Sequence, residues 1–196
     1  MDIAYVLVYV DDIILTVSST TLLQHVVDQL RSAFAIKDLG ALRFSLGVQV
    51  CRDDRGFFLS QAQYTKDILE RAGMANCKLA STLVDTKSKL SMHDGEPATD
   101  GTFYRSITGA LQYLTLTRPD IAYAVNQACL HMHSPTDAHW NLVKRILRYL
   151  WGTIDHGITI SASSSTELKA YSDADWVGCP GTQRSTSGYC VFLGDY

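Results

Sequence analysis

Two adjacent carboxylates, Asp11 and Asp12, are the residues whose type and position most directly indicate chemistry. They separate two apolar, β-branched runs, residues 3–10 and 13–18, and this pattern predicts a β-hairpin with the carboxylates in its turn. Like charges held this close raise each other's pKa, and a divalent cation relieves the repulsion. Two Mg²⁺ ions held by carboxylates and substrate phosphates can clamp an in-line phosphoryl transfer. Since Asp is also a common turn residue, the pair by itself does not establish a metal site.

The elements that follow the hairpin mix helices with strands. Apolar side chains recur at helical spacing from Thr20 to Phe34, with Ser18 to Thr21 as candidate N-caps. A second hairpin is predicted from Leu42–Val50 and Phe57–Ser60, which flank a charged turn. After it, we expect an amphipathic helix over 61–72 that ends at Gly73, and then a long irregular connection over 74–101.

The second half of the chain predicts three helices followed by strands. The first helix runs from about Phe103 to Thr115, Pro119 and Pro135 mark the starts of the other two, and Gly152 ends the last. Strands are predicted over 157–161, 167–172 and 188–193, with a Ser-rich turn or linker over 161–165. The fold class is therefore α+β, with a domain boundary near Thr153.

Composition limits the class of protein. The 196 residues, 46% of them hydrophobic and 19% charged, are typical of a soluble folded chain of one to two domains. The net charge of −3 lacks the basic excess of a self-sufficient nucleic-acid binder, so nucleic-acid contact needs local basic faces or another segment. Five cysteines without a C-x-x-C pair indicate reduced thiols in an intracellular compartment. No membrane span or targeting signal is predicted.

The string Tyr9-Val10-Asp11-Asp12 between apolar strands resembles the palm signature of reverse transcriptases, and further motifs resemble the copia-type (Ty1/copia) retrotransposon enzymes. The chain also resembles the short copia-derived reading frames found in plant genomes. The supporting segments follow one another in family order along nearly the whole chain. They are residues 7–16, 34–40, 46–48, 59–61 with Tyr64, 104–114, 117–121, 147–150 with 152–153, 171–176 and 184–188.

The resemblance implies three segments: a partial palm over 1–73, thumb and connection helices over 74–152, and the start of an RNase H-like domain over 153–196. It implies an RNA-directed DNA polymerase that uses two Mg²⁺ ions, an RNA or DNA template–primer and deoxynucleotides. Under this interpretation the catalytic and metal-binding residues are Asp11, Asp12 and Asp173. The residues that line the active site or the primer are Tyr9, Val10, Leu46 and Gly47.

The family's polymerase site also uses a carboxylate and a fingers region that lie upstream, and Met1 lies shortly before Asp11. The later acidic residues of RNase H would lie beyond Tyr196. We therefore expect both sites to be incomplete in these residues, and the chain to be inactive alone. Two alternatives stay open: a non-catalytic remnant that binds nucleic acid or protein, and a reading frame whose product is degraded. Exposed strand edges would favour self-association.

Two further clusters have competing interpretations. Lys144, Arg145 and Arg148 would lie together on the last helix, where they would contact a nucleic-acid backbone or form a solvated face. His131, His133 and His139 lie near Cys129 in sequence. A zinc site is one interpretation, but the spacing fits no standard finger, so a solvated or C-capping histidine cluster is favoured.

Overall fold

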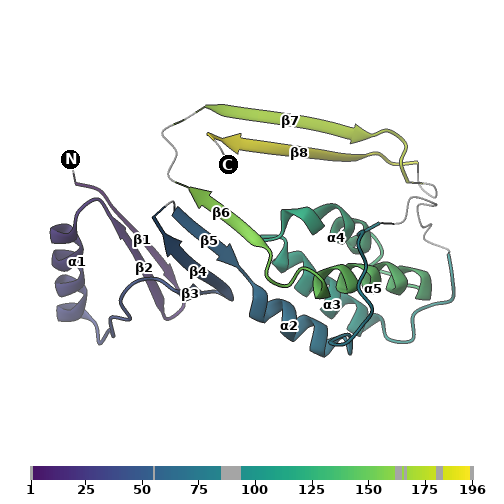
Figure 1. Cartoon of the computed structure of the whole chain (residues 1–196), viewed down its shortest axis with the longest axis horizontal. Coiled ribbons are helices and arrows are strands. Elements are labelled where there is room, and N and C mark those ends of the chain that lie inside the picture. Colours follow the sequence, from purple (N-terminus) through teal and green to yellow (C-terminus); the bar gives the residue numbers. More distant parts are fainter. Residues whose placement is uncertain are drawn as a thin grey trace. The chain divides into compact units, whose positions relative to one another are not determined.

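A computed structural model of the chain describes residues 2–54, 56–84, 94–161, 165, 167–179 and 183–194. The chain divides into two compact units, Met1–Leu46 and Gly47–Tyr196. Its mixture of helices and strands confirms the α+β class (Figure 1). In the described parts, no helix is long and apolar enough to cross a membrane. The boundaries of the three sequence-predicted segments stay predictions.

The first unit contains the predicted hairpin and helix. Strands β1 (Ala4–Tyr9) and β2 (Asp12–Val17) pair antiparallel, and α1 (Thr20–Ala33) packs beside β2. Ser19 caps α1, because its side-chain oxygen accepts a hydrogen bond from the Leu22 amide at 3.3 Å. A two-residue strand, β3 (Phe44–Ser45), lies at the end of this unit. The predicted hairpin and helix are thus confirmed to within a few residues.

In the second unit, three antiparallel strands form a sheet. The hairpin of β4 (Val48–Asp53) and β5 (Gly56–Ser60) is confirmed, and β6 (Gly157–Ser161) pairs along the other edge of β5. The sequence predicts β6 as a strand but not its partner. Backbones approach closely here, since a Cβ on Gly56 would overlap the Ile160 carbonyl and one on Gly157 would overlap the Leu59 carbonyl. Hence β6, which begins just after the predicted domain boundary near Thr153, pairs with a hairpin that lies before that boundary in the chain.

The second unit also contains helices, which confirm the predicted helical region from Phe103 to Gly152. They are α2 (Ala62–Arg71), α3 (Gly101–Leu114), the short 3₁₀ helix η1 (Pro119–Ile121), α4 (Ala122–Cys129) and α5 (Asp137–Trp151). Asp100 caps α3 by accepting hydrogen bonds from the Thr102 and Phe103 amides at 3.0 and 2.8 Å. Pro119 is the first residue of η1, and Gly152 is the C-cap of α5.

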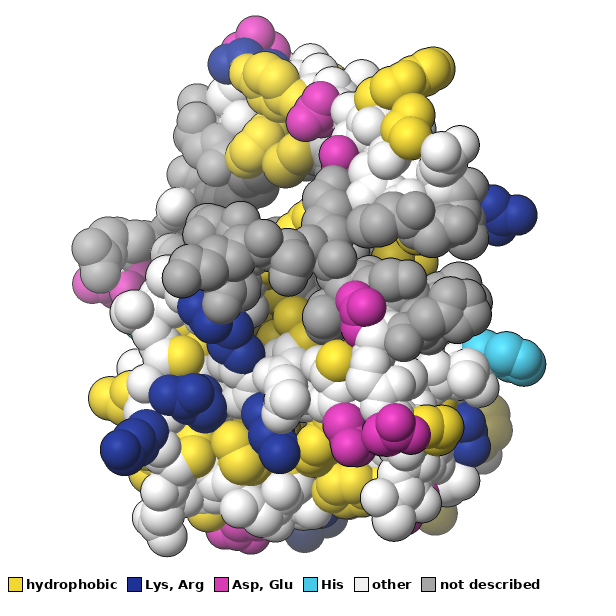
Figure 2. Space-filling model, turned by 90° about the vertical axis from the view of Figure 1, so that its right-hand side faces the viewer, with side chains coloured by type: hydrophobic (Ala, Val, Ile, Leu, Met, Phe, Trp, Pro, Cys, Tyr) yellow, Lys and Arg dark blue, Asp and Glu magenta, His cyan; other side chains and the backbone are white. Residues whose placement is uncertain are grey.

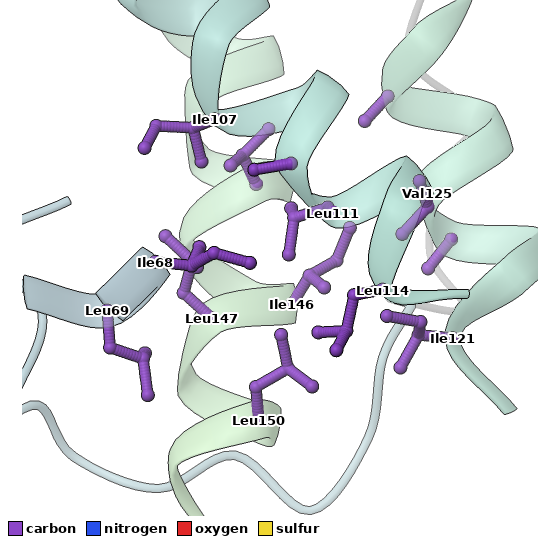
Figure 3. Close-up of a cluster of buried hydrophobic side chains, with 14 of the residues drawn as sticks. Ile68, Leu69, Ile107, Leu111, Leu114, Ile121, Val125, Ile146, Leu147 and Leu150 are labelled. Atoms are coloured by element: carbon purple, nitrogen blue, oxygen red, sulfur yellow. The ribbon is translucent and has the colours of Figure 1, made fainter. Parts of the chain in front are cut away.

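The hydrophobic core of the second unit lies among these helices. Figure 3 shows side chains from α2, α3, η1, α4 and α5 converging on one another. Nine of the side chains that it labels have no measurable exposure: Ile68, Leu69, Ile107, Leu111, Leu114, Ile121, Ile146, Leu147 and Leu150. Burial of a large aliphatic side chain contributes about 1.5–3 kcal/mol, so this cluster is the main source of stability for the helical bundle.

The predicted connection between α2 and α3 is irregular in its described parts. Residues 74–84 and 94–100 contain no helix or strand, and only an isolated bridge joins Pro97 to Thr136. Residues 85–93 lie outside the described residues, as does most of the predicted Ser-rich turn over 161–165.

The C-terminal hairpin pairs β7 (Leu168–Asp175) with β8 (Thr186–Leu193), both longer than predicted. Large apolar side chains on it are exposed, among them Tyr171 and Tyr189 at 63% and 85%. In Figure 2, hydrophobic side chains also lie at the molecular surface, between charged ones. Self-association through such surfaces stays a prediction.

Candidate functional site

The turn between β1 and β2 consists of two residues, Val10 and Asp11, because Tyr9 and Asp12 are opposite each other across the ladder. Hairpins of this length need a positive φ at the first central residue, and Val10 has a φ of 50°. The β-branched side chain makes this conformation costly, by about 1–3 kcal/mol. Both Asp11 and Asp12 are exposed. The tip of the hairpin therefore presents two carboxylates, one in the turn and one at the start of β2, next to a strained backbone position.

The strain gives a direct prediction. Replacing Val10 by glycine removes the Cβ from an unfavourable conformation, so the hairpin should gain about 0.5–1 kcal/mol after the entropy cost of glycine is subtracted. Amide hydrogen exchange across the β1–β2 ladder should then slow by roughly 2- to 5-fold. Val8→Gly is the matched control, because Val8 lies in an extended strand of the same hairpin and the same change should speed exchange there. Faster exchange in both variants would show that Val10 is not strained.

The two carboxylates are the right type of ligand for a hard divalent cation, but two are too few to complete its coordination. Asp11 and Asp12 offer oxygen ligands of the type that Mg²⁺ prefers. Within the described ranges, no group of three or more His, Cys, Asp or Glu side chains could hold a metal ion. Other ligands, such as substrate phosphates, would have to complete a metal site at this turn.

Leu46 and Gly47 form a second turn with unusual backbone angles. Their φ values are 50° and 75°, the conformation that a type I′ turn requires at both central positions. Leu46 is 40% exposed, and a Cβ on Gly47 would lie 3.7 Å from the Tyr113 ring. The ring of Tyr113 meets that of Tyr64 edge to face, with centroids 5.4 Å apart. Gly47 therefore lies beside an aromatic pair from α2 and α3.

Gln61 connects the end of β5 to the helical bundle. It is 2% exposed, and its Oε1 accepts a hydrogen bond from the Thr117 hydroxyl at 2.8 Å. Its Nε2 has no hydrogen-bond partner among the described residues. Segments 59–61 and 117–121, which carry the family resemblance, thus meet in the second unit.

The buried side chain of Arg118 is the centre of a polar network that the sequence interpretation missed. The side chain is 2% exposed, and its Nε and Nη2 donate to the two carboxylate oxygens of Asp120 at 2.9 and 2.8 Å. Its Nη1 donates to the Thr153 carbonyl and its Nη2 to the Thr153 hydroxyl, both at 2.8 Å. The Tyr149 hydroxyl also donates to Asp120, at 3.0 Å. The network joins η1 to the end of α5 and to the residues that lead into β6.

Partial burial opposes the charge of Asp120, but hydrogen bonds and the positive charge of Arg118 outweigh it, so the pKa of this carboxyl lies below its ordinary value. A shallow pocket lies beside the pair, lined by Phe58, Pro119, Asp155, His156 and Gly157 together with Arg118 and Asp120. The only sequence signal for this network is that Arg118 lies two residues before Asp120, with Pro119 between them. This spacing does not indicate that the arginine is buried.

Residues 3–85, which include the Asp11-Asp12 turn, match the family described as reverse transcriptase (RNA-dependent DNA polymerase). An uncharacterised mitochondrial protein of Arabidopsis thaliana is 51% identical over 97% of this chain and 79% of its own length. The Pol polyprotein of the Arabidopsis transposon RE2 is 48% identical over 99% of this chain, and that of the tobacco (Nicotiana tabacum) transposon TNT 1-94 is 36% identical over 93%.

The chain belongs to the reverse-transcriptase family of copia-type retrotransposon Pol polyproteins. It spans only 13% of the RE2 polyprotein and 14% of the TNT 1-94 polyprotein. No solved structure matches the chain.

The other carboxylate predicted to bind metal, Asp173, lies on β7 opposite Gly188 of β8. It is exposed, and its Oδ1 accepts a hydrogen bond from the next amide, that of Ala174, at 2.8 Å. Asp175 lies two residues along the same strand and therefore projects from the same face. The role of Asp173 as a ligand stays a prediction.

Two basic residues of α5, Arg145 and Arg148, contact the connection between α2 and α3. Arg145 donates to the carbonyl and hydroxyl oxygens of Thr82 at 3.2 and 2.6 Å. Arg148 donates to the Lys78 carbonyl at 2.7 Å and to the Leu79 carbonyl at 3.4 Å. These hydrogen bonds hold residues 78–82 against the helix. Contact between a nucleic-acid backbone and Lys144, Arg145 or Arg148 stays a prediction.

The favoured interpretation of the histidines as a solvated cluster is wrong for two of the three. His139 is fully buried and His131 is 9% exposed, and their rings stack with centroids 3.6 Å apart and planes within 10°. His133 is exposed. The signal that sequence reasoning overlooked is the spacing of Thr136 and His139, which is that of an N-cap and the third residue of its helix.

Proposed function

We propose that this chain is the part of a retrotransposon reverse transcriptase that carries the catalytic Asp turn and the elements that hold the primer. The observation that carries the proposal is the exposed pair Asp11 and Asp12 at the two-residue turn of β1 and β2, inside the segment matched by the reverse-transcriptase family. The RE2 and TNT 1-94 relatives, each named as a Pol polyprotein, align over more than nine-tenths of the chain and support it.

Within this function, Asp11 and Asp12 would hold the divalent cations. Mg²⁺ bound there would activate the primer 3′-hydroxyl and neutralise charge on the incoming nucleotide's phosphates. The side chains of Tyr9 and Val10 flank the carboxylates along the chain, and both are exposed, at 57% and 83%. They are therefore accessible to a primer end or a nucleotide.

The assignments of the other segments rest on the same proposal. Residues 1–73 would form part of the palm, with the hairpin of β4 and β5 and the Leu46-Gly47 turn placed to grip the primer. Residues 74–152 would form the thumb and connection, and residues 153–196 an RNase H-like segment in which Asp173 is a metal ligand. The antiparallel pairing of β5 with β6 means that the first and third of these segments share a sheet.

We further propose that these 196 residues do not extend primers by themselves. Nucleotidyl transfer needs the 3′-hydroxyl, the α-phosphate and two metal ions held together, and this depends on more ligands than two adjacent carboxylates.

Primer extension on an RNA template tests the proposal directly. The purified chain should give no product with Mg²⁺ or Mn²⁺. Adding a separately expressed segment of the RE2 polyprotein that supplies the fingers and the other palm carboxylate should restore extension. Extension by the chain alone would contradict the proposed incompleteness of the site. No extension in the mixture, although the two segments bind each other, would contradict the assignment of the Asp11-Asp12 turn.

A further inference from the structure

The N-terminus of α5 is held by a histidine in an unusual role. The Thr136 amide donates a hydrogen bond to Nδ1 of His139 at 3.0 Å, and the His139 amide donates to the Thr136 hydroxyl at 3.5 Å. This is a capping box in which an imidazole replaces the usual Glu or Gln. In this arrangement Nδ1 of His139 is the hydrogen-bond acceptor. Protonation of Nδ1 would remove the acceptor.

The same cap holds residues 94–98, which we call the strap. The Thr136 hydroxyl donates to the Asp94 carbonyl at 2.5 Å. The Ala98 amide donates to the Pro135 carbonyl at 2.9 Å, and the Asp137 amide donates to the Glu96 carbonyl at 3.0 Å. A Cβ on Gly95 would lie 3.2 Å from the Ala138 amide nitrogen, so the strap packs closely on the first turn of α5. The capping box and the attachment of the strap therefore share Thr136.

His131 completes the arrangement from the residues that follow α4. Its ring stacks on that of His139, and its Nδ1 is buried without a hydrogen-bond partner among the described residues. A proton added to this nitrogen would be a buried, unpaired donor on a charged ring, which is costly. Burial, and then repulsion from His139, lower the pKa of His131 to about 4, although Asp94 acts in the opposite direction.

Other ionisable groups lie on the elements around this pair. They are Glu96 on the strap, Asp137 on α5, Cys129 and His133 close to His131 in sequence, and Tyr104 and Arg105 on α3. Arg105 donates to the Met132 carbonyl and Tyr104 to the Ala128 carbonyl, so both contact the backbone on either side of His131.

We infer that the stacked His131–His139 pair is an acid-sensitive latch that holds the strap on the N-terminus of α5. Below a threshold pH, protonated His131 leaves the stack for solvent, His139 loses its support, and the Thr136 cap and the strap separate from the helix. Acid favours opening because His131 binds a proton more tightly in the open state than in the closed state. The attachment is complete above the ordinary histidine pKa of 6.5 and is lost as pH falls toward 4. The open population should rise by up to about tenfold per pH unit in that window.

Backbone amide NMR of the full chain between pH 7.5 and 4.0 tests the latch. The Thr136 and Ala98 amide signals should change together in the wild-type chain. They should stay in place in His131→Phe, which keeps an aromatic ring in the stack but cannot be protonated. His133→Phe is the matched control, because His133 is exposed, and it should behave like the wild type. An unchanged wild-type spectrum at pH 4.0, or the same transition in His131→Phe, would overturn the inference.

A second readout keeps the test decisive if His131→Phe does not fold. The ring C–H signals of His131 in the wild-type chain report its own protonation. Their midpoint should lie below 6.5 and coincide with the change at Thr136 and Ala98. A His131 ring that titrates without any change at those two amides would overturn the latch.

Discussion

Replacing Arg118 by alanine is expected to lower the free energy of unfolding of the second unit by about 3 kcal/mol. The change removes the donors that satisfy the Thr153 carbonyl and the Asp120 carboxylate, and it leaves a cavity where a side chain of 2% exposure was packed. This free-energy loss is at the low end of the range for a broken buried ion pair. The reason is that the Asp120 side chain is 37% exposed, so water can partly replace its lost hydrogen bonds. Arg118→Lys should recover little of this free energy, since an ammonium group cannot make the bidentate contact with Asp120.

Urea denaturation at neutral pH measures this loss as a lower midpoint at an unchanged slope. Arg71→Ala is the matched control in the same unit. Arg71 is an exposed arginine whose Nη2 donates to the Ser106 hydroxyl at 2.8 Å, so its removal should cost less than about 1 kcal/mol. Equal losses for the two arginines would show that the Arg118 network does not stabilise the fold.

Local sequence patterns predicted the elements well, because the signals for those elements are themselves local. The boundaries of α1 and α5 follow from apolar spacing at 3.6 residues and from capping residues within one turn of each end. The hairpin of β4 and β5 follows from its charged turn. In each case the residues that decide the structure are neighbours in the chain.

The pairing of β5 with β6 was not predictable in this way. The two strands are separated by the whole helical bundle, and their contact depends on close backbone approach at Gly56 and Gly157. The burial of Arg118 and His139 was also missed, because both residue types usually keep contact with water. Their positions become clear only when distant groups, such as the Thr153 carbonyl and the His131 ring, are placed beside them.

For the candidate site, the sequence identified the carboxylates but not their setting. The motif predicts that Asp11 and Asp12 lie in a turn. The structure confirms this for Asp11, places Asp12 at the first residue of β2, and leaves both side chains exposed. The positive φ of Val10 could not be read from the motif, because valine rarely adopts it. A two-metal site needs ligands in addition to these two carboxylates. The sequence around the motif does not indicate where those ligands lie.

The most direct test of the proposed function places this chain inside a relative. The region of the RE2 polyprotein that aligns with this chain, 194 residues at 48% identity, is replaced by this chain, and RNA-templated primer extension is measured with Mg²⁺. The graft should extend primers. Asp11→Asn in the graft should reduce the rate by at least about 10²- to 10³-fold, because it removes a metal ligand from the reacting centre.

Asp28→Asn is the control for that measurement, since Asp28 is an exposed carboxylate on α1 in the same unit, where it accepts a hydrogen bond from Gln24 at 3.0 Å. We predict an active graft whose rate is unchanged by Asp28→Asn and abolished by Asp11→Asn. A folded graft that does not extend primers, or one that extends them equally well with Asp11→Asn, would contradict the account.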